Sequence, residues 1–507
     1  MLANELTLNQ IAKISSGNLT YDSYQKRWRV YLDSYTGGED YRRGKYLTRY
    51  QLETQAEYDQ RIQNTPLENH CASIVSVYKS FLFRVSPERK FNSIEGMTEL
   101  EDFIKDADMD GRSLNAFMKD VATWSSVFGH CFIMVTKPNV GAITRAEEQI
   151  IGARPYVSLL TPLVVLDWYY KRQPSGRYEL DYFKYVEEVI DNILVVKEWT
   201  RDTIKTTHIN DEKKEIIEET TEVNGLGEIP VVTVYNIRST VRGLGVSDLA
   251  DICDLQRFIY NATSEAVESL RMDSHPSLVA TPETRVGTGA GSLILMPENL
   301  DPGLKPYILQ NTGASVEMIY KSIQHTTSAI DKIANTGAVR ATESRTLSGV
   351  AMEVEFSLLS AKLSEKADNL ELAEEQMWKF WCKYMGMNSD VEIDYPGEFN
   401  VRDTESQIRQ LKTAADTNPQ DPRVKQAIDD AILDWLEVDD SEEPEETLSE
   451  EIKEDIQDSI MAGKTDSEIV SEGITTAQLT AAKADLLQVE VPNNTRPLGT
   501  ITRAQPD

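Results

Sequence analysis

The sequence predicts an α+β fold that is mainly helical, and three observations support this class. Long tracts between residues 247 and 385 place apolar residues at the spacing of one helix face. Segments between residues 131 and 236 are instead rich in β-branched and aromatic residues, which is typical of strands. A short Pro/Gly-rich module, residues 276–312, separates two of the long helices. This arrangement differs from a globular enzyme core and favours a subunit that packs against copies of itself.

The first part of the chain, which we expect to end near Gly243, contains both kinds of element. Gly37 and Gly38 interrupt the helical spacing, and Asn210 with Asp211 predicts a hairpin turn. The predicted helices cover residues 21–60, 65–83 and 113–128. The predicted strands cover residues 131–135, 156–170, 193–208, 213–223 and 229–236.

Three long helices follow. Ser247 is a suitable N-cap for the first, which is expected to run through Asp273 and to be about 40 Å long. The second is predicted at residues 315–334. A polar loop at residues 335–346 leads to the third, residues 347–385, which is about 58 Å long. Its apolar stripe is predicted to include Val350, Val354, Leu358, Ala361, Leu370, Ala373, Met377, Phe380 and Tyr384.

The last hundred residues carry weaker signals. Pro396 and Gly397 end the helical tract, and residues 404–460 predict short helices with breaks at prolines. Residues 434–458 are strongly acidic and predict a solvated outer face rather than a calcium loop, because the ordered spacing of such a loop is missing. From residue 491 onward the composition predicts a mobile tail.

The charge balance excludes several function classes. The chain has 52 Lys and Arg against 83 Asp and Glu, a formal charge of −31. A dedicated nucleic-acid binder needs a basic footprint, which this composition lacks. Four cysteines without CxxC pairing indicate a reducing compartment, and no secretory signal or membrane span is predicted. We therefore expect a soluble protein synthesised in a cytoplasm.

No motif predicts catalysis, a metal or a cofactor. The sequence GTGAG at residues 287–291 lacks both the GxGxxG fingerprint and the GK[ST] of a P-loop, so it predicts a turn or mobile loop. The adjacent pairs His70–Cys71 and His130–Cys131 lie among apolar neighbours, which favours buried structural roles. No histidines show the spacing of a zinc site.

Basic residues near the second and third helices permit two interpretations. Arg340 and Arg345 flank Thr342, Glu343 and Ser344 in the polar loop. The loop is either an ordinary solvated loop or a flexible finger that touches a polyanion.

The order of these elements resembles the portal (head-to-tail connector) proteins of tailed bacteriophages. The opening segment reads YLDSYTGGEDYRRGKYLTR at residues 31–49 and YDQRIQNTPLENH at 58–70. IPVVTVYN at residues 229–236 and GVSDLADICDLQRFIYNATSE at 245–265 resemble a strand and the first stem helix of that family. TESRTLSGVAMEVEFSLLSAKLSEKADNLELAEEQMWKF at residues 342–380 resembles its tunnel loop and long wing helix. The likeness covers roughly residues 20–400.

The resemblance implies a division of the chain into the parts of a portal subunit. Residues 1–243 would form the wing, and residues 349–402 its long helix and return strand. The stem helices would be 244–273 and 314–334, on either side of a clip at residues 274–313. The remaining parts would be a tunnel loop at residues 335–348, a helical crown at 403–490 and a flexible tail at 491–507.

The resemblance also implies a function: twelve copies would form a ring at one capsid vertex of the virion, a channel for genome packaging and ejection. The clip, with Arg285, Gly287, Gly289 and Gly291, would dock the large terminase and later the head-tail adaptor. The wing would face the major capsid protein and the scaffolding protein. The tunnel-loop residues Arg340, Thr342, Glu343, Ser344 and Arg345 would touch double-stranded DNA weakly and without sequence preference.

Lys321 and Lys332 of the second stem helix would line the bore or pair with acidic residues of a neighbouring subunit. No membrane partner, cofactor or enzymatic activity is implied. Two alternatives stay open: another oligomeric phage head component, and a cytoplasmic α+β enzyme. An acidic channel suits a portal, because a basic lining would trap the DNA that has to pass through it.

Overall fold

The computed structural model divides the 507-residue chain into two units, residues 1–401 and 402–507. It describes residues 19–397 and 399, except 139, 142–143, 211, 213–214, 275–276, 283, 287–293, 296–298, 300, 310–313 and 341–348. The predictions for the crown, the acidic run, the tail and the GTGAG loop therefore lie outside the described residues. So do those for residues 342–345 of the tunnel loop.

The described part of the chain opens with four helices. They are α2 (Leu19–Thr36), α3 (Gly38–Arg43), α4 (Gln55–Asn64) and α5 (His70–Leu82). Gly37 separates α2 from α3 with a φ of +64°, which a residue without a Cβ adopts at low cost. The Asn69 side chain accepts a hydrogen bond from the Ala72 amide and so caps α5. The predicted helix 65–83 thus begins five residues too early, at Thr65 instead of His70.

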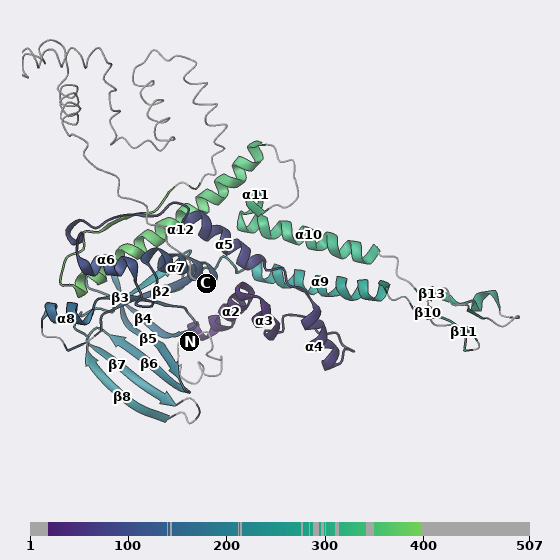
Figure 1. The fold of residues 1–507 in the computed structure, drawn as a ribbon, viewed down its shortest axis with the longest axis horizontal. Coiled ribbons are helices and arrows are strands. Elements are labelled where there is room, and N and C mark those ends of the chain that lie inside the picture. The colour runs from purple at the N-terminus through teal and green to yellow at the C-terminus, as the bar shows by residue number, and fades with distance from the viewer. Residues whose placement is uncertain are drawn as a thin grey trace, which may run out of the picture. The chain divides into compact units, whose positions relative to one another are not determined.

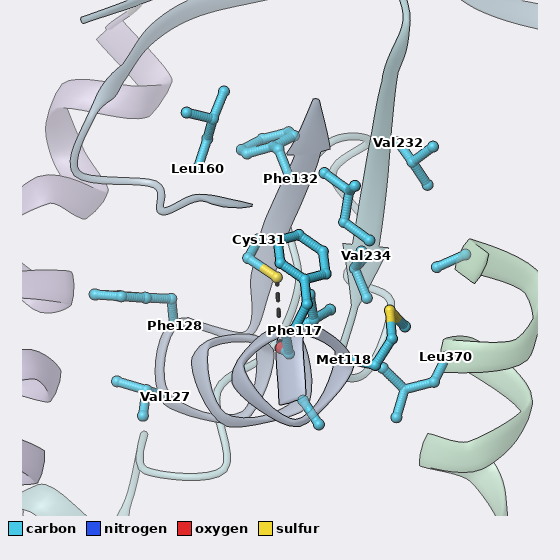
Figure 2. Close-up of a cluster of buried hydrophobic side chains, with 14 of the residues drawn as sticks. Phe117, Met118, Val127, Phe128, Cys131, Phe132, Leu160, Val232, Val234 and Leu370 are labelled. Atoms are coloured by element: carbon cyan, nitrogen blue, oxygen red, sulfur yellow. Dashed lines mark hydrogen bonds between the residues drawn. The ribbon is translucent and has the colours of Figure 1, made fainter. Parts of the chain in front are cut away.

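The core forms around α7 (Leu114–Phe128) and a three-stranded sheet of order β3-β2-β9, as the close-up in Figure 2 shows. The strands are β2 (His130–Thr136), β3 (Tyr156–Leu160) and β9 (Val231–Tyr235), paired antiparallel. Phe117 and Phe132 are fully buried between helix and strands. The predicted helix at 113–128 is confirmed, with Ser113 as its N-cap.

The largest sheet has five antiparallel strands in the order β4-β5-β6-β7-β8 (Figure 1). The strands are β4 (Val165–Arg172), β5 (Tyr178–Ile190), β6 (Ile193–Thr200), β7 (Thr203–Asn210) and β8 (Glu215–Val223). The predicted strand 156–170 is in fact two strands, because a turn at residues 161–164 divides it. The predicted strand 193–208 is likewise two strands, and β5 is a strand that the prediction missed. The turn at Asn210 is confirmed, since Asn210 pairs with Glu215 at the end of β7 and β8.

Short elements complete this half of the unit. They are β1 (Glu88–Lys90), η2 (Asn92–Ile94), α6 (Thr98–Lys105), α8 (Arg145–Ile151) and β14 (Glu392–Asp394). Strand β14 returns after the longest helix and pairs antiparallel with β1.

Helix α9 (Ile252–Ser274) packs along α10 (Ala314–Ala334), and both lead into a small β module at their far ends (Figure 1). The module contains β10 (Ser277–Val279), β11 (Arg285–Val286), β12 (Ile294–Leu295), η3 (Pro302–Leu304) and β13 (Tyr307–Leu309). The start of α9 differs from the prediction: Ser247 accepts a hydrogen bond from the Leu249 amide in a turn, and the helix begins only at Ile252.

Helix α12 (Gly349–Tyr384) is the longest, and its two halves differ in burial. Met377, Trp378 and Trp381 of its second half are fully buried in the core. In the first half of α12, Val354 is 57% exposed and Leu358 is 53% exposed, so this part of the apolar stripe is uncovered in the single subunit. Among the helices that the structure describes, none is long and apolar enough to cross a membrane.

Candidate functional site

Four of the predicted channel and docking residues lie in the described part of the chain, on three elements. Lys321 and Lys332 lie on α10, and Arg285 lies on β11, where it pairs with Leu295 of β12. Arg340 is the last residue of α11 (Gly337–Arg340), a short helix within the predicted loop 335–346. The loop interpretation is therefore wrong for residues 337–340.

Arg340 is held inside its own subunit. One terminal nitrogen of its guanidinium lies 2.7 Å from Asp331 Oδ1 of α10, and the other lies 2.8 Å from His70 Nδ1 of α5. The Arg340 side chain is only 12% exposed. Burial, followed by the charge of Arg340, lowers the pKa of His70, so this imidazole is neutral and accepts the hydrogen bond. Arg340 thus anchors α11 to α10 and α5.

A cavity of about 730 Å³ opens beside this anchor. Lys321, His325 and Lys332 of α10 line it together with Arg340, and Glu355 and Leu358 of α12 form part of its wall. The structure thus brings three of the predicted cations to one cavity. Lys321 pairs at 2.7 Å with Glu317 of its own helix, and both side chains are largely exposed.

A buried carboxylate lies just before α9. The side chain of Asp248 is 1% exposed and forms ion pairs with Lys366 at 2.5 Å and Lys362 at 3.1 Å, both on α12. The Ser126 hydroxyl at the end of α7 donates a hydrogen bond of 2.6 Å to the same carboxylate. Burial alone would raise the pKa of Asp248, but the two ammonium groups and these hydrogen bonds outweigh it and hold the pKa at about 2.

The same network reaches the end of α10. Lys362 Nζ donates to the Tyr78 hydroxyl at 2.9 Å, and that hydroxyl donates to the carbonyl of Ala334 at 2.5 Å. Tyr78 belongs to α5, and Ala334 is the last residue of α10. Helix α12 is therefore connected through buried polar side chains to the entry of α9 and to the exit of α10. We call Asp248, Lys362, Lys366, Ser126 and Tyr78 the joint.

The sequence interpretation missed the joint. One signal was available: Lys366 stands three residues after Leu363 and four before Leu370, both buried on α12. A lysine on the apolar face of a helix predicts a buried ion pair. Its partner Asp248 is distant in sequence, and only the fold brings the two together.

The histidine–cysteine pairs have no catalytic geometry. Burial lowers the pKa of His130 to about 3 and raises the pKa of the Cys131 thiol. All four cysteines are buried and unpaired. In the described part of the chain, no group of three or more potential ligands could hold a metal ion.

Comparison with known proteins identifies the family. The family model described as "Phage portal protein, SPP1 Gp6-like" matches residues 74–464, which is most of the chain. The chain belongs to this phage portal protein family. The match to the portal family begins after the opening segment 31–70 on which part of the resemblance rested, and it extends beyond residue 400.

Solved structures similar to this portal-family chain come from gene transfer agent (GTA) particles. A virion structure of the native particle is 8% identical, covers 71% of this chain and 89% of its own, and has a TM-score of 0.39. A neck of the empty particle, computed with C6 symmetry, is 9% identical. The match covers 75% of this chain and 93% of the neck chain, also with a TM-score of 0.39. A neck of the native particle, computed with C12 symmetry, is 10% identical. The match covers 71% of this chain and 89% of the neck chain, with a TM-score of 0.37. No curated protein sequence matches the chain.

Proposed function

We propose that this chain is the subunit of a twelve-membered portal ring at one vertex of a phage-like capsid. The ring is the channel through which double-stranded DNA is packaged and later ejected. The observation that carries this proposal is the match of the portal family model over residues 74–464. The protein is synthesised in the host cytoplasm and becomes part of the virion.

The elements of the subunit suit the parts of a portal. We assign residues 1–243 and 349–402 to the wing, 244–273 and 314–334 to the stem, and 274–313 to the clip. The antiparallel pair α9–α10 with a β module at its end supports the stem and clip assignments. The tunnel loop at residues 335–348, the crown at 403–490 and the tail at 491–507 complete the proposal.

The clip docks the packaging motor, the large terminase, and after packaging the head-tail adaptor. Arg285 is exposed on β11 and is available for such a contact. Gly287, Gly289 and Gly291 follow it in the proposed docking loop. The wing contacts the major capsid protein and the scaffolding protein.

Contact with DNA is weak in this proposal. A net charge of −31 per subunit repels the DNA duplex. A basic channel wall would instead bind the duplex through counterion release and slow every step of DNA movement. Arg345 with Thr342, Glu343 and Ser344 touches phosphates from the tunnel loop. Asp331 already neutralises the charge of Arg340, so in this proposal Arg340 does not contact DNA. It supports the tunnel loop by holding α11 in place.

The enzyme alternative has little in its favour: the Ser126 hydroxyl does lie beside Lys366 and Asp248, but all three side chains are buried in the joint, where a substrate has no access. Another oligomeric head component differs from a portal in copy number and position. Tomography of virions with a tagged copy of this chain separates the two. A single tagged vertex with about twelve copies supports the portal, whereas tags on all vertices contradict it.

A further inference from the structure

Two exposed faces of the stem helices carry opposite charges. Asp254 and Glu265 lie on one face of α9, and Lys321 and Lys332 lie on the face of α10 that points away from α9. All four residues are exposed. Asp254, Glu265 and Lys332 have no ion-pair partner among the described residues, and Lys321 has only the exposed Glu317 four residues earlier.

The two acidic residues and the two lysines have the same spacing. In each pair the residues are eleven positions apart, which is three helical turns and about 16 Å. The side chains of each pair therefore project from the same side of their helix. Phe258 (48% exposed) shares the acidic face, and Met318 (71% exposed) shares the basic face.

The charges also lie at matching levels along the antiparallel helix pair. The β10–β13 ladder pairs Ser277 with Leu309, and the two helices run back from this ladder side by side (Figure 1). Both helices rise 1.5 Å per residue. Counted from the helix ends nearest the ladder, Asp254 lies 20 residues before Ser274 and Lys332 lies 18 residues after Ala314. Glu265 and Lys321 lie 9 and 7 residues from the same ends, so the members of each pair differ by two residues, about 3 Å of helical rise.

We propose that the acidic face of α9 (Asp254, Phe258, Glu265) docks on the basic face of α10 (Lys321, His325, Lys332) of a second copy of this chain. This inference rests on the ring proposed above. Rotation about an axis that follows the helices keeps each level unchanged, so Asp254 meets Lys332 and Glu265 meets Lys321 of the neighbour. Because the two faces differ, the contact is heterologous, and repeated contacts of this kind form the ring proposed above when the rotation between neighbours closes.

The alternative position for the two lysines is the bore of the channel. There they would face water and DNA, and Asp254 and Glu265 would have no contact with them. Complementary charge at two matched levels favours the subunit interface, since opposite charges fix the register of an interface.

Paired cysteine variants of the full chain test the proposal. Asp254→Cys with Lys332→Cys should form a disulfide between subunits under mild oxidation, seen as a ladder of multimers on a non-reducing gel. Asp254→Cys with Lys321→Cys is the matched control, because these residues differ in level by three turns. A ring without a ladder from the first pair, or an equal ladder from both pairs, would overturn the proposed interface.

Charge reversal gives an independent readout. Asp254→Lys should reduce the fraction of assembled ring at least tenfold, and adding Lys332→Asp to it should restore the ring. Asp59→Lys, an exposed reversal on α4, should leave assembly unchanged. Failure of the double variant to restore the ring contradicts the pairing. A wild-type chain that stays monomeric contradicts the proposed ring itself, so the two failures are distinguishable by native mass.

Discussion

At the residue scale, the joint combines full burial with charge. Asp248 has two ammonium partners on α12, and its hydroxyl partner Ser126 lies in the last turn of α7. Removing one member of such a buried pair leaves the others without compensation, which costs more than the pair itself contributes. The joint therefore fixes where α12 meets the segment before α9 and the end of α10.

Replacing Asp248 with Asn should lower the free energy of unfolding by about 3 kcal/mol at pH 7. A carboxyl whose pKa falls to about 2 on folding stabilises the fold at any pH above its ordinary pKa of about 4. This contribution is lost as the pH falls from about 4 to 2. Denaturant titrations of both proteins should thus converge in that window. A difference that is constant from pH 7 to pH 2 would contradict the ion pair.

Arg340 and Arg345 should behave differently, although both were predicted to contact DNA. Arg340→Ala removes the anchor of α11 to Asp331 and His70, so amide exchange over residues 335–340 should accelerate about tenfold or more. Arg345→Ala serves as the control and should leave exchange there unchanged. Equal amide exchange rates in the wild type and in Arg340→Ala would contradict a stabilising role for the contacts of Arg340 with Asp331 and His70.

At the element scale, the close approach of two backbone segments positions the entry to α9. Gly129 ends α7 with a φ of +89°, and a Cβ there would lie 2.6 Å from the Gly245 carbonyl oxygen. A Cβ on Gly245 would in turn overlap the carbonyl of Gly129. Only glycine fits at either position, and the segment before α9 is thereby held against the core.

Gly129→Ala and Gly245→Ala should each lower the free energy of unfolding by about 1–3 kcal/mol, through a strained backbone or overpacking. Gly225→Ala is the matched control, since a Cβ there meets no atom within 4 Å. The denaturant concentration at the midpoint of unfolding is measured for all three variants and compared. Equal midpoints for Gly245→Ala and Gly225→Ala would contradict the close approach.

Sequence periodicity predicted α7, α10 and α12 well, because each carries a long apolar stripe. It failed where tertiary contacts decide. Strand β5 mixes aromatic with charged residues, and only the fold buries Phe183 and Tyr185. Ser247 lies in a turn before α9, where its hydroxyl donates to the carbonyl of Val127 in α7. The cations Lys321, Lys332 and Arg340 were found from sequence, but their shared cavity and the joint depend on the fold. The roles of Arg285 and of Arg345 stay predictions.

At the scale of the whole molecule, the negative charge predicts poor DNA binding. The assembled protein should not shift a DNA duplex on a gel at physiological salt, in contrast to a nucleic-acid binder with a basic footprint. Lysozyme at equal concentration is a basic control. Micromolar or tighter binding with a steep salt dependence would contradict the idea of a channel that lets DNA slide.

Exposed apolar residues point to the same assembly. Val354 and Leu358 of α12, Phe258 of α9 and Met318 of α10 are exposed in the single subunit. Single exposed apolar residues are common on protein surfaces, but the proposed ring would cover Phe258 and Met318 between its subunits. The acidic face of α9 and the basic face of α10 supply the register.

The native mass of the purified full-length protein, with single-particle images of the same sample, tests the central claim most directly. The account predicts a closed ring with a central hole and a mass of about twelve times 57.2 kDa. A monomer or dimer at micromolar concentration, in the presence as well as the absence of scaffolding protein, would contradict it.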